Sequence, residues 1–392
     1  MRYFKRWSGQ TSPLQVLSGS RARRIACSLL RILIVGFLTY TAAAASGVAD
    51  PLDRPATITR NAARCFLQGA ATAGDRLVAV GERGIVILSD DNGKTWRQAK
   101  VPTSVELTAV EFPTPQQGWA VGHAGVVLHT EDGGETWIRQ LDGKIAAQLA
   151  LEAAQAKAAA RPNDKAGKRQ LAEAQLFVDE GSDKPFLDLH FENERTGFVV
   201  GAYGLMFRTG DGGKTWKSWI GRLDNPEGLN IYAIRVAGNN VYLAGEKGLF
   251  LRSTDKGNSF TRVTTPYEGT FFSIAIFPSG EIVLAGLRGN AYRSADQGKT
   301  FSKVDVPVGV SFSASATLPD GTALFTNQEG DVLESHDQGR TMQLVQARSM
   351  RSLTAITAVR DGVLLAVGSE GAIQISLSSA APATKTETGS VR

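Results

Sequence analysis

The sequence predicts an all-β fold, a seven-bladed β-propeller of four-stranded blades. Two motifs recur along the chain at a common spacing of 41 residues, and short segments rich in β-branched and aromatic residues lie between them. A repeat of about 40–45 residues with four short strands has the size of one propeller blade. Residues 50–378 hold seven such repeats once a single insertion is set aside.

The first 49 residues predict an export signal. They contain seven of the 43 Lys and Arg residues and no acid, and an apolar segment, residues 32–45, follows the last basic residue. Its 14 residues are short of the ~20 that a membrane-spanning helix needs, but they fit the hydrophobic region of a signal peptide. An uncleaved N-terminal anchor is the alternative. We therefore expect an exported protein that is also able to associate with the membrane.

The rest of the chain has no excess of positive charge. After residue 49, 36 Lys and Arg stand against 38 Asp and Glu. This balance does not favour a nucleic-acid partner. Cys65 is the single cysteine in this part, so an internal disulfide is not expected.

Two short motifs mark the repeats. The first has the consensus S/T-x-D-x-G-x-S/T-aromatic, with Met342 as the one exception to the last position; its copies are SDDNGKTW (89–96), TEDGGETW (130–137), TGDGGKTW (209–216), STDKGNSF (253–260), SADQGKTF (294–301) and SHDQGRTM (335–342). The second is a G-x-x-G turn that begins ten residues before each Asp, at Gly81, Gly122, Gly201, Gly245, Gly286 and, in variant form, Asn327. A seventh turn, residues 368–371, has no Asp motif after it.

The spacing of the turns gives the blade count. Successive turns begin 41, 79, 44, 41, 41 and 41 residues apart, and 79 is one repeat plus an insertion. In the second repeat the four strands are LTAVEF, GWAVG, VVLHT and TWIRQ. The seventh repeat ends after its third strand, and we expect residues 55–64 to supply the fourth and close the ring. Residues 379–392 are polar and predicted to be disordered.

The Asp motif is interpreted as a structural clip at the hairpin between the third and fourth strands. A short acid can accept hydrogen bonds from the backbone of its own turn, and the aromatic residue can pack between blades. A calcium loop needs more acidic ligands than the one constant Asp, and an acid repeated around a ring does not make a single active site. The residues assigned this structural role are Asp91, Trp96, Asp132, Trp137, Asp211, Trp216, Asp255, Phe260, Asp296, Phe301 and Asp337.

The insertion, residues 142–184, lies between blades 2 and 3 and is predicted to be an α-helical hairpin. Its two arms are rich in helix formers and are separated by RPND (161–164), where Asp164 can cap the second helix. Ile145, Leu149 and Leu151 make too small an apolar stripe for independent stability. The arms must pack on each other, on the propeller or on a partner, so both a lid and a partner-binding arm remain open.

Propeller geometry places the G-x-x-G turns and the insertion on one face and the Asp motifs on the other. The variable residues of the turns are expected to surround the central opening as a mixed-charge rim for a protein partner. Solvated loop charges without a partner are the alternative. The rim candidates are Arg83, His123, Tyr203, Lys247, Arg288, Glu329 and Glu370.

The Asp motif is similar to the Asp-box, or bacterial-neuraminidase repeat. Combined with the G-x-x-G turns in a seven-bladed exported chain, it resembles the photosystem II stability/assembly factor family over nearly all of residues 50–378. The resemblance implies a non-catalytic scaffold in the periplasm or a thylakoid lumen that binds a membrane protein or its assembly intermediate, without cofactor or catalytic residues. We also expect the chain to be monomeric and to bind no metal. Relatives in non-photosynthetic bacteria often accompany transporters of the resistance-nodulation-division type. The insertion is a departure from the photosynthetic members of the family.

A glycan-binding or glycoside-hydrolysing propeller of the sialidase type is the alternative function. Its chemistry needs three arginines, whereas the rim offers two, Arg83 and Arg288. It also needs a Tyr–Glu nucleophile pair; Tyr203 and Glu246 could form one, but their spacing in the sequence does not require it. The four histidines show no metal-binding spacing. The sequence therefore favours a binding scaffold over an enzyme.

Overall fold

The computed structural model describes residues 49–181, 183–346, 352–359 and 363–376. The described elements belong to a compact unit that begins at Asp50. The predicted signal peptide, residues 1–49, falls outside the described residues except for Ala49, and the predicted disordered tail, residues 379–392, lies wholly outside them. Among the described residues, no helix is long and apolar enough to cross a membrane.

The described strands form seven antiparallel sheets, and in each sheet the strands follow one another in chain order. The first sheet holds β1 (Leu67–Ala73), β2 (Arg76–Gly81), β3 (Val86–Ser89) and β4 (Arg97–Gln98). The second holds β5 (Leu107–Glu111), β6 (Gly118–Gly122), β7 (Val127–Thr130) and β8 (Ile138–Leu141). The third holds β9 (Phe186–Phe191), β10 (Gly197–Gly201), β11 (Met206–Thr209) and β12 (Lys217–Ser218).

The remaining four sheets continue this order. The fourth holds β13 (Ile231–Ala237), β14 (Asn240–Gly245), β15 (Phe250–Ser253) and β16 (Thr261–Arg262). The fifth holds β17 (Phe271–Ile276), β18 (Ile282–Gly286), β19 (Ala291–Ser294) and β20 (Ser302–Val304). The sixth holds β21 (Phe312–Thr317), β22 (Ala323–Asn327), β23 (Val332–Ser335) and β24 (Gln343–Gln346), and the seventh holds β25 (Leu353–Ala358), β26 (Val363–Gly368) and β27 (Gly371–Ser376).

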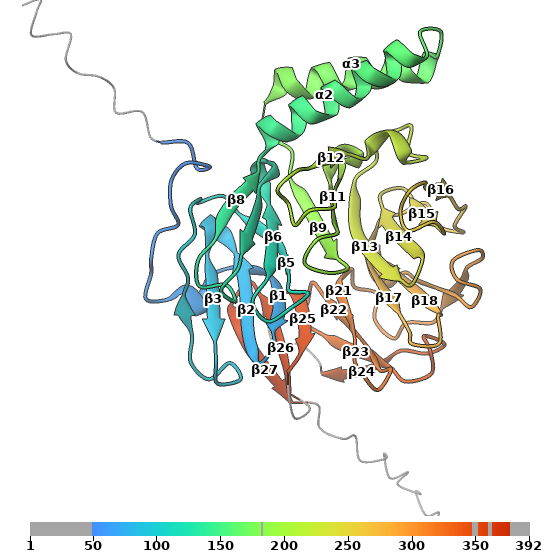
Figure 1. Ribbon diagram of the computed structural model, residues 1–392. Helices are drawn as coiled ribbons and strands as arrows, with labels where there is room; N and C mark the ends of the chain where they lie inside the picture. Colours follow the sequence, from blue (N-terminus) through green and yellow to red (C-terminus); the bar gives the residue numbers. More distant parts are fainter. Residues whose placement is uncertain (1–48, 182, 347–351, 360–362, 377–392) are drawn as a thin grey trace, which may run out of the picture. The chain divides into compact units, whose positions relative to one another are not determined.

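The first strand of each sheet is the innermost. β1 contacts β5, and the contacts continue through β9, β13, β17, β21 and β25 back to β1 (Figure 1). The last step is reinforced by a hydrogen bond of 2.6 Å that the Thr354 hydroxyl donates to the Leu67 carbonyl. The second strands, such as GWAVG of β6 and IVLAG of β18, are buried on both faces because neighbouring sheets pack against them. The fold is thus propeller-like and all-β, apart from two α-helices and short 3₁₀ turns.

The N-terminal segment does not add a strand to the seventh sheet. That sheet has three described strands, and residues 55–64 contain the 3₁₀ turn η1 (Ala62–Arg64), which contacts β27. The residues before η1 bind the first sheet, since Thr59 N donates to Gln98 Oε1 at 2.9 Å and Ala56 N donates to the Val101 carbonyl at 3.1 Å. The expected fourth strand is therefore not present in the described residues, because the backbone of this segment is already bonded elsewhere.

The Asp motifs form one hydrogen-bond pattern in all six copies. The first carboxylate oxygen accepts the N–H of the residue four positions later at 2.9–3.0 Å. The second oxygen accepts the hydroxyl of that same Thr or Ser at 2.6–2.7 Å. The Ser or Thr two positions before the Asp donates its hydroxyl to the first oxygen at 2.7–3.0 Å. Each carboxylate thus binds three donors from its own hairpin.

The last residue of each Asp motif faces the protein interior. Trp137, Trp216, Phe260 and Met342 are buried, and Trp96 and Phe301 are half-buried. The Trp137 indole also donates to the Gly134 carbonyl at 2.9 Å, which ties the ring to its own turn. The carboxylate and the aromatic ring together hold the hairpin and its neighbouring blade in register.

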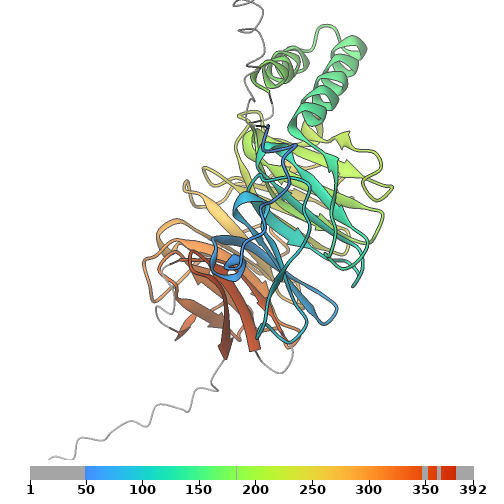
Figure 2. The same ribbon diagram turned by 90° about the vertical axis from the view of Figure 1, so that its left-hand side faces the viewer.

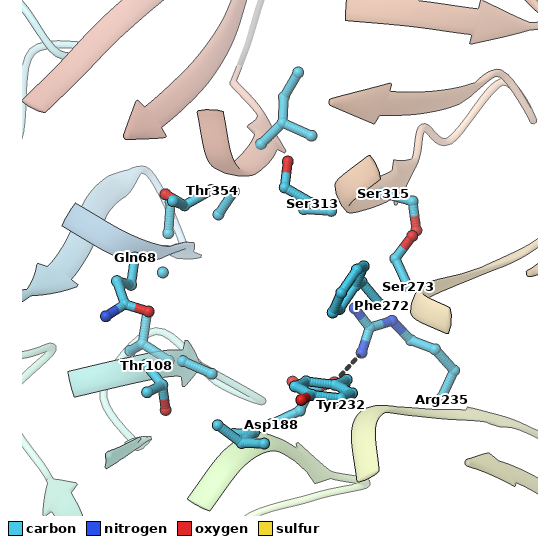
Figure 3. A pocket seen from close by; sticks show the side chains of 18 residues that line it. Gln68, Thr108, Asp188, Tyr232, Arg235, Phe272, Ser273, Ser313, Ser315 and Thr354 are labelled. Atoms are coloured by element: carbon cyan, nitrogen blue, oxygen red, sulfur yellow. Dashed lines mark hydrogen bonds and ion pairs between the residues drawn. The ribbon is translucent and has the colours of Figure 1, made fainter. Parts of the chain in front are cut away.

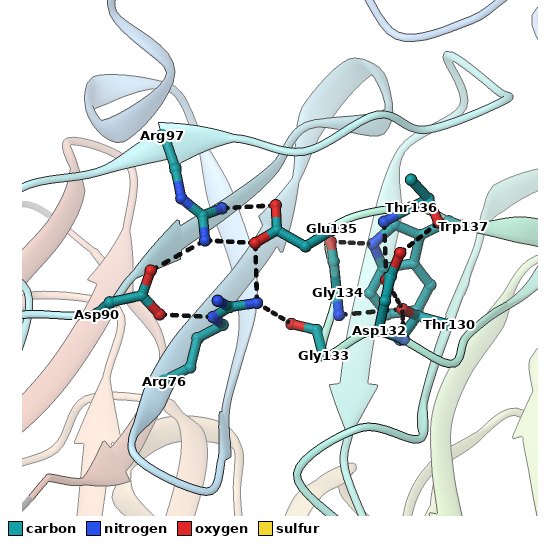
Figure 4. A network of polar contacts seen from close by, with 10 residues as sticks. All are labelled: Arg76, Asp90, Arg97, Thr130, Asp132, Gly133, Gly134, Glu135, Thr136 and Trp137. Atoms are coloured by element: carbon teal, nitrogen blue, oxygen red, sulfur yellow. Dashed lines mark hydrogen bonds and ion pairs between the residues drawn. The ribbon is translucent and has the colours of Figure 1, made fainter.

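An ionic network joins the Asp motifs of the first two blades (Figure 4). Asp90 accepts from Arg76 Nε at 2.6 Å and from Arg97 Nη2 at 2.9 Å. Glu135, in the second motif, contacts the same two guanidinium groups at 3.1 and 2.5 Å. Single exposed ion pairs contribute little, but four charges that share partners restrain one another and link the two blades.

The insertion forms two helices between β8 and β9: α2 (Gly143–Ala160) and α3 (Lys165–Glu180). Asp142 caps α2 by accepting the N–H groups of Lys144 and Ile145 at 3.0 and 3.1 Å, and Asp164 caps α3 by accepting that of Ala166 at 3.0 Å. Both helices lie beside β8 and β12 (Figures 1 and 2), and α2 contacts β12.

The hairpin is docked at its base. Ala146, Ala147 and Ala150 of α2 share a buried cluster with Phe177 of α3 and with Trp119 and Phe207 of the second and third blades. The start of α2 also contacts the second G-x-x-G turn, where a Cβ on Gly125 would come within 2.7 Å of Gly143 Cα. Further along, Leu151, Ala154 and Ala174 pack the two helices on each other. The base of the hairpin is therefore part of the propeller core.

The Asp motifs predict a specific acid sensitivity. Hydrogen bonds from Thr95 lower the pKa of Asp91 to about 2, and those from Ser253 and Ser259 lower the pKa of Asp255 to about 2. Such a carboxylate stabilises the fold fully above the pKa of ~3.9 that an unfolded Asp has, and this contribution is lost as the pH falls through the folded-state value. We expect the urea midpoint of unfolding to fall steeply between pH 4 and pH 2.

The substitutions Asp91→Asn and Asp255→Asn, made together, test this assignment. An amide cannot titrate, so the double variant should be less stable at pH 7 but lose less stability between pH 4 and pH 2. Asp179→Asn, on an exposed position of α3, controls for the change in net charge. Equal slopes in the wild type and the double variant would contradict the assignment.

Candidate functional site

The seven G-x-x-G turns are bonded to the inner strands in one way. The N–H of the second turn residue donates to the carbonyl of the residue that precedes the inner strand of the same blade, at 2.9–3.1 Å in all seven copies. The first examples are Glu82 N to the Phe66 carbonyl and His123 N to the Glu106 carbonyl. These bonds place every turn at the end of the sheets where the inner strands begin.

This close approach explains the first glycine of the motif. A Cβ on Gly81, Gly122 or Gly201 would lie 2.1–2.2 Å from the carbonyl oxygen that receives the hydrogen bond. No side chain fits at such a distance, so glycine is a packing requirement in these turns. The sixth turn differs, because Asn327 takes the first position there while Gln328 N still donates to the Ser311 carbonyl at 3.1 Å.

In five of the turns the third residue is held in the left-handed region of φ. Arg83, Tyr203, Lys247 and Arg288 have φ between 49° and 55° and are exposed, whereas Ala124, with φ of 54°, is half-buried. The structure places all seven rim candidates at this end of the sheets, and all are exposed; they are Arg83, His123, Tyr203, Lys247, Arg288, Glu329 and Glu370. The role of this rim in binding a partner is a proposal, taken up below.

The central channel, a cavity of about 180 Å³, is lined by other residues (Figure 3). Each inner strand has a β-bulge at its start, and the bulged residue lines the channel. These residues are Gln68, Thr108, Leu187, Tyr232, Phe272, Ser313 and Thr354. The rim candidates lie in the turns between the second and third strands of the sheets, and none of them is among the residues that line this cavity.

Sequence reasoning missed the bulged residues, although a signal is present. Each stands 13 or 14 residues before the first residue of the G-x-x-G turn in its repeat. Their identities differ from blade to blade, and a motif search detects only positions where the residue type recurs. A positional alignment of the repeats would have found them.

The channel contains an ion pair. Arg235 Nη1 lies 2.7 Å from Asp188 Oδ2, and the same carboxylate accepts the N–H groups of Ile234 at 2.9 Å and Leu189 at 3.0 Å. Burial opposes the charge of Arg235, but the Asp188 carboxylate outweighs it, so the pKa of Arg235 is raised. The pair joins the inner strands of the third and fourth blades.

A second hollow, of about 240 Å³, lies between the helical hairpin and the third blade. Its apolar wall includes Phe177 of α3, Leu205 next to the third G-x-x-G turn, and Ile220. Leu176 and Tyr203 line the same groove and are large apolar side chains that are 54% and 64% exposed. We refer to this hollow as the hairpin groove.

Tyr203 is held firmly at the edge of the hairpin groove. Its φ of 55° is unusual for a bulky residue, and its backbone N–H donates to Asn230 Oδ1 at 2.7 Å. The Lys184 ammonium lies 5.1 Å from the ring centres of both Tyr203 and Phe177. Burial opposes the charge of Lys184, but hydrogen bonds to Glu180 and Asp183 outweigh it and raise its pKa. A fixed aromatic ring beside an apolar hollow is suited to anchor a partner side chain.

The residues considered for glycoside hydrolysis have structural contacts. Both oxygens of Glu246 bind Asn230: Oε2 accepts its N–H at 3.1 Å and Oε1 accepts its Nδ2 at 2.9 Å. Glu82 of the first turn makes a similar bond to the N–H of Phe66 at 3.2 Å. Within the described ranges, no group of three or more His, Cys, Asp or Glu side chains could hold a metal ion.

The chain resembles proteins of known family. A family model described as photosynthesis system II assembly factor YCF48 matches residues 58–160 and 169–387. Over 77 residues the chain is 34% identical to the photosystem II assembly lipoprotein Ycf48 of Synechococcus sp. (strain CC9902). That match covers 20% of this chain and 23% of the relative, so the activity of the whole relative is not carried over with it.

Solved structures share the fold. YCF48 bound to D1 peptide superimposes with a TM-score of 0.60 at 15% identity, over 84% of this chain and 98% of that one. YCF48 from Cyanidioschyzon merolae gives 0.57 at 16% identity, over 82% and 98%. The WD40 β-propeller domain of Doa1 gives 0.57 at 9% identity, over 83% and 95%. At these identities the likeness extends to the fold alone.

The channel ion pair predicts a stability difference between two substitutions. Asp188→Ala leaves Arg235 without its carboxylate and the Ile234 N–H without its acceptor, and we expect a loss of about 2–3 kcal/mol in the free energy of unfolding. The expected loss is small for a broken buried ion pair, because 36% of the Arg235 side chain is accessible to solvent. Asp188→Asn keeps an acceptor and should cost less. Equal urea midpoints for the wild type and Asp188→Ala would show that the pair does not stabilise the ring.

Proposed function

Because the chain belongs to the family of photosynthesis system II assembly factor YCF48, we propose that it is a non-catalytic, exported scaffold whose G-x-x-G face binds a segment of a membrane protein and assists its assembly, stability or operation. The family is one of assembly factors, and a solved relative is described as bound to D1 peptide. The curated relative is a lipoprotein, which supports export and membrane association. The chain itself acts as a monomer in the periplasm or thylakoid lumen.

The hairpin groove is the observation that carries this proposal. It combines an apolar hollow with two exposed apolar side chains, Tyr203 and Leu176. The backbone of Tyr203 is held in place by a hydrogen bond from its N–H to Asn230 Oδ1. Large apolar side chains that gather around a hollow on an otherwise polar surface are typical of protein-binding sites. The charged rim residues Arg83, Lys247 and Arg288 lie on the same face. Such charges orient an approaching partner more than they increase its affinity.

The partner is a membrane-protein segment exposed on the side to which the chain is exported. In a photosynthetic host it is a photosystem subunit such as D1, and in another host it is a transporter of the resistance-nodulation-division type.

Photo-crosslinking from position 203 tests the proposal. A benzophenone amino acid placed at Tyr203 should crosslink a membrane protein in intact cells, and mass spectrometry of detergent-solubilised membranes identifies it. The double substitution Tyr203→Ser with Leu176→Ser should reduce recovery of this partner at least tenfold, because two apolar anchors are lost. Deletion of residues 142–184 is not a suitable test, since the base of the hairpin belongs to the core.

Ile138→Ser is the matched control. Ile138 is 60% exposed and pairs with His129 near the Asp-motif end of β7 and β8, away from the G-x-x-G face. It should leave partner recovery unchanged. Equal recovery with the double variant and the wild type, at unchanged thermal stability, would refute binding at the groove.

A further inference from the structure

The distal end of the helical hairpin is strongly basic. Residues 157–169 include the end of α2, the turn and the start of α3, and they hold five basic residues against one acid, Asp164. The remainder of residues 50–392 has 31 Lys and Arg against 37 Asp and Glu, so a net negative body carries a positive end. We refer to residues 157–169 as the basic tip; its basic residues are Lys157, Arg161, Lys165, Lys168 and Arg169.

Most of this positive charge has no counter-charge in the protein. Lys157 Nζ donates to the neutral Gln170 side chain at 2.9 Å, whereas Arg169 pairs with Glu173 at 3.2 Å. The carboxylate of Asp164 is occupied as the cap of α3. Three cations of the tip are exposed and form no ion pair with a described Asp or Glu: Arg161, Lys165 and Lys168.

The charges of α3 run against the dipole of the helix. Lys165 and Lys168 lie in its first turn, which has no acid, and Asp179 and Glu180 lie in its last turn, which has no base. A helix is stabilised by the reverse order, with acids at its start and bases at its end. The basic start of α3 therefore costs helix stability, and folding does not account for it.

The basic tip combines its charge with small side chains. Apart from the charged residues and Asn163 it consists of Ala, Gly and Pro, and the exposed large apolar residues of the insertion, Ile145 and Leu176, lie outside it. Protein partners are usually anchored by large buried side chains, whereas anionic lipid headgroups attract basic segments by charge alone. The hairpin turn lies at the end of the insertion away from β8 (Figures 1 and 2), where it can approach a flat surface.

We propose that the basic tip binds the headgroups of anionic phospholipids at the membrane surface. Attraction at the tip and repulsion of the net negative body together orient the protein with the hairpin toward the membrane. The contact is peripheral, because the tip has no large apolar side chain to insert into the lipid. The inference goes beyond the proposed function and does not depend on the hairpin groove, although this orientation brings the groove close to membrane proteins.

Vesicle flotation tests the proposal. The compact unit, residues 50–392, is used without the leader, whose apolar segment would itself bind vesicles. It should float with vesicles made of equal parts of phosphatidylglycerol and phosphatidylcholine, but not with vesicles of phosphatidylcholine alone. Added NaCl should release it, because salt screens the exposed charges of the tip.

The triple substitution Arg161→Gln, Lys165→Gln and Lys168→Gln removes the unpaired cations. Affinity for the anionic vesicles should fall about a hundredfold, since each basic residue near such a surface contributes about fivefold. Thermal stability should be nearly unchanged, because the three side chains are exposed and two of them oppose the dipole of α3. Loss of binding is then not a consequence of unfolding.

The matched control is the triple substitution Lys94→Gln, Lys214→Gln and Lys299→Gln. It removes three exposed positive charges from the Asp motifs, at the other end of the sheets, and changes the net charge by the same amount. This control should bind anionic vesicles as the wild type does, since these lysines face away from the tip.

Equal vesicle affinity of the wild type and the tip variant would overturn the proposal, because the lipid contact would then lie elsewhere on the protein. Failure of the wild type to float with anionic vesicles would overturn it as well. In that case, binding to poly-glutamate that is lost in the tip variant would assign the tip to an acidic protein instead. Neither result bears on the hairpin groove, because crosslinking from position 203 reports on a different surface.

Discussion

The backbone hydrogen bond between each G-x-x-G turn and the start of its inner strand is the constraint on which the rest of this structure depends. In the six turns that begin with glycine, it brings a carbonyl oxygen so close to the first turn residue that a Cβ is excluded, as at Gly81 and Gly286. In five of the turns the third residue is in the left-handed region, and four of these residues, all except Ala124, are exposed to solvent. A requirement of packing thus determines which residues the propeller presents on this face.

The two ends of the blades consequently offer different chemistry. At the Asp-motif end, each carboxylate is occupied by three donors of its own hairpin, and little hydrogen-bonding capacity remains for a partner. At the G-x-x-G end, the turn is bonded to the inner strand through its backbone, and side chains such as Arg83, Tyr203 and Arg288 are exposed to solvent. The helical hairpin is seated at this end as well, because α2 begins against the second turn. This difference supports the proposal that a partner binds on the G-x-x-G face.

The sequence was sufficient for features that arise from local chemistry repeated in every blade. The strands, the Asp turns and the caps at Asp142 and Asp164 depend on residues only a few positions apart, and periodicity makes such signals strong. Features that depend on contacts between distant segments could not be predicted from the sequence. Residues 55–64 were expected to form a strand, but the backbone N–H groups of Thr59 and Ala56 donate instead to the Gln98 side chain and the Val101 carbonyl. The channel wall was missed because each blade contributes a different side chain at the same bulge.

The hairpin groove also depends on long-range packing, and its composition argues that it exists for binding. The base of α2 buries alanines, which allow the helix to approach the blade closely. Phe177 of α3 is buried, whereas Leu176 and Tyr203 remain exposed around the hollow, at a cost in hydration free energy of apolar surface. An apolar partner side chain that covers both residues would remove this cost, which supports the proposal that a partner binds in the groove.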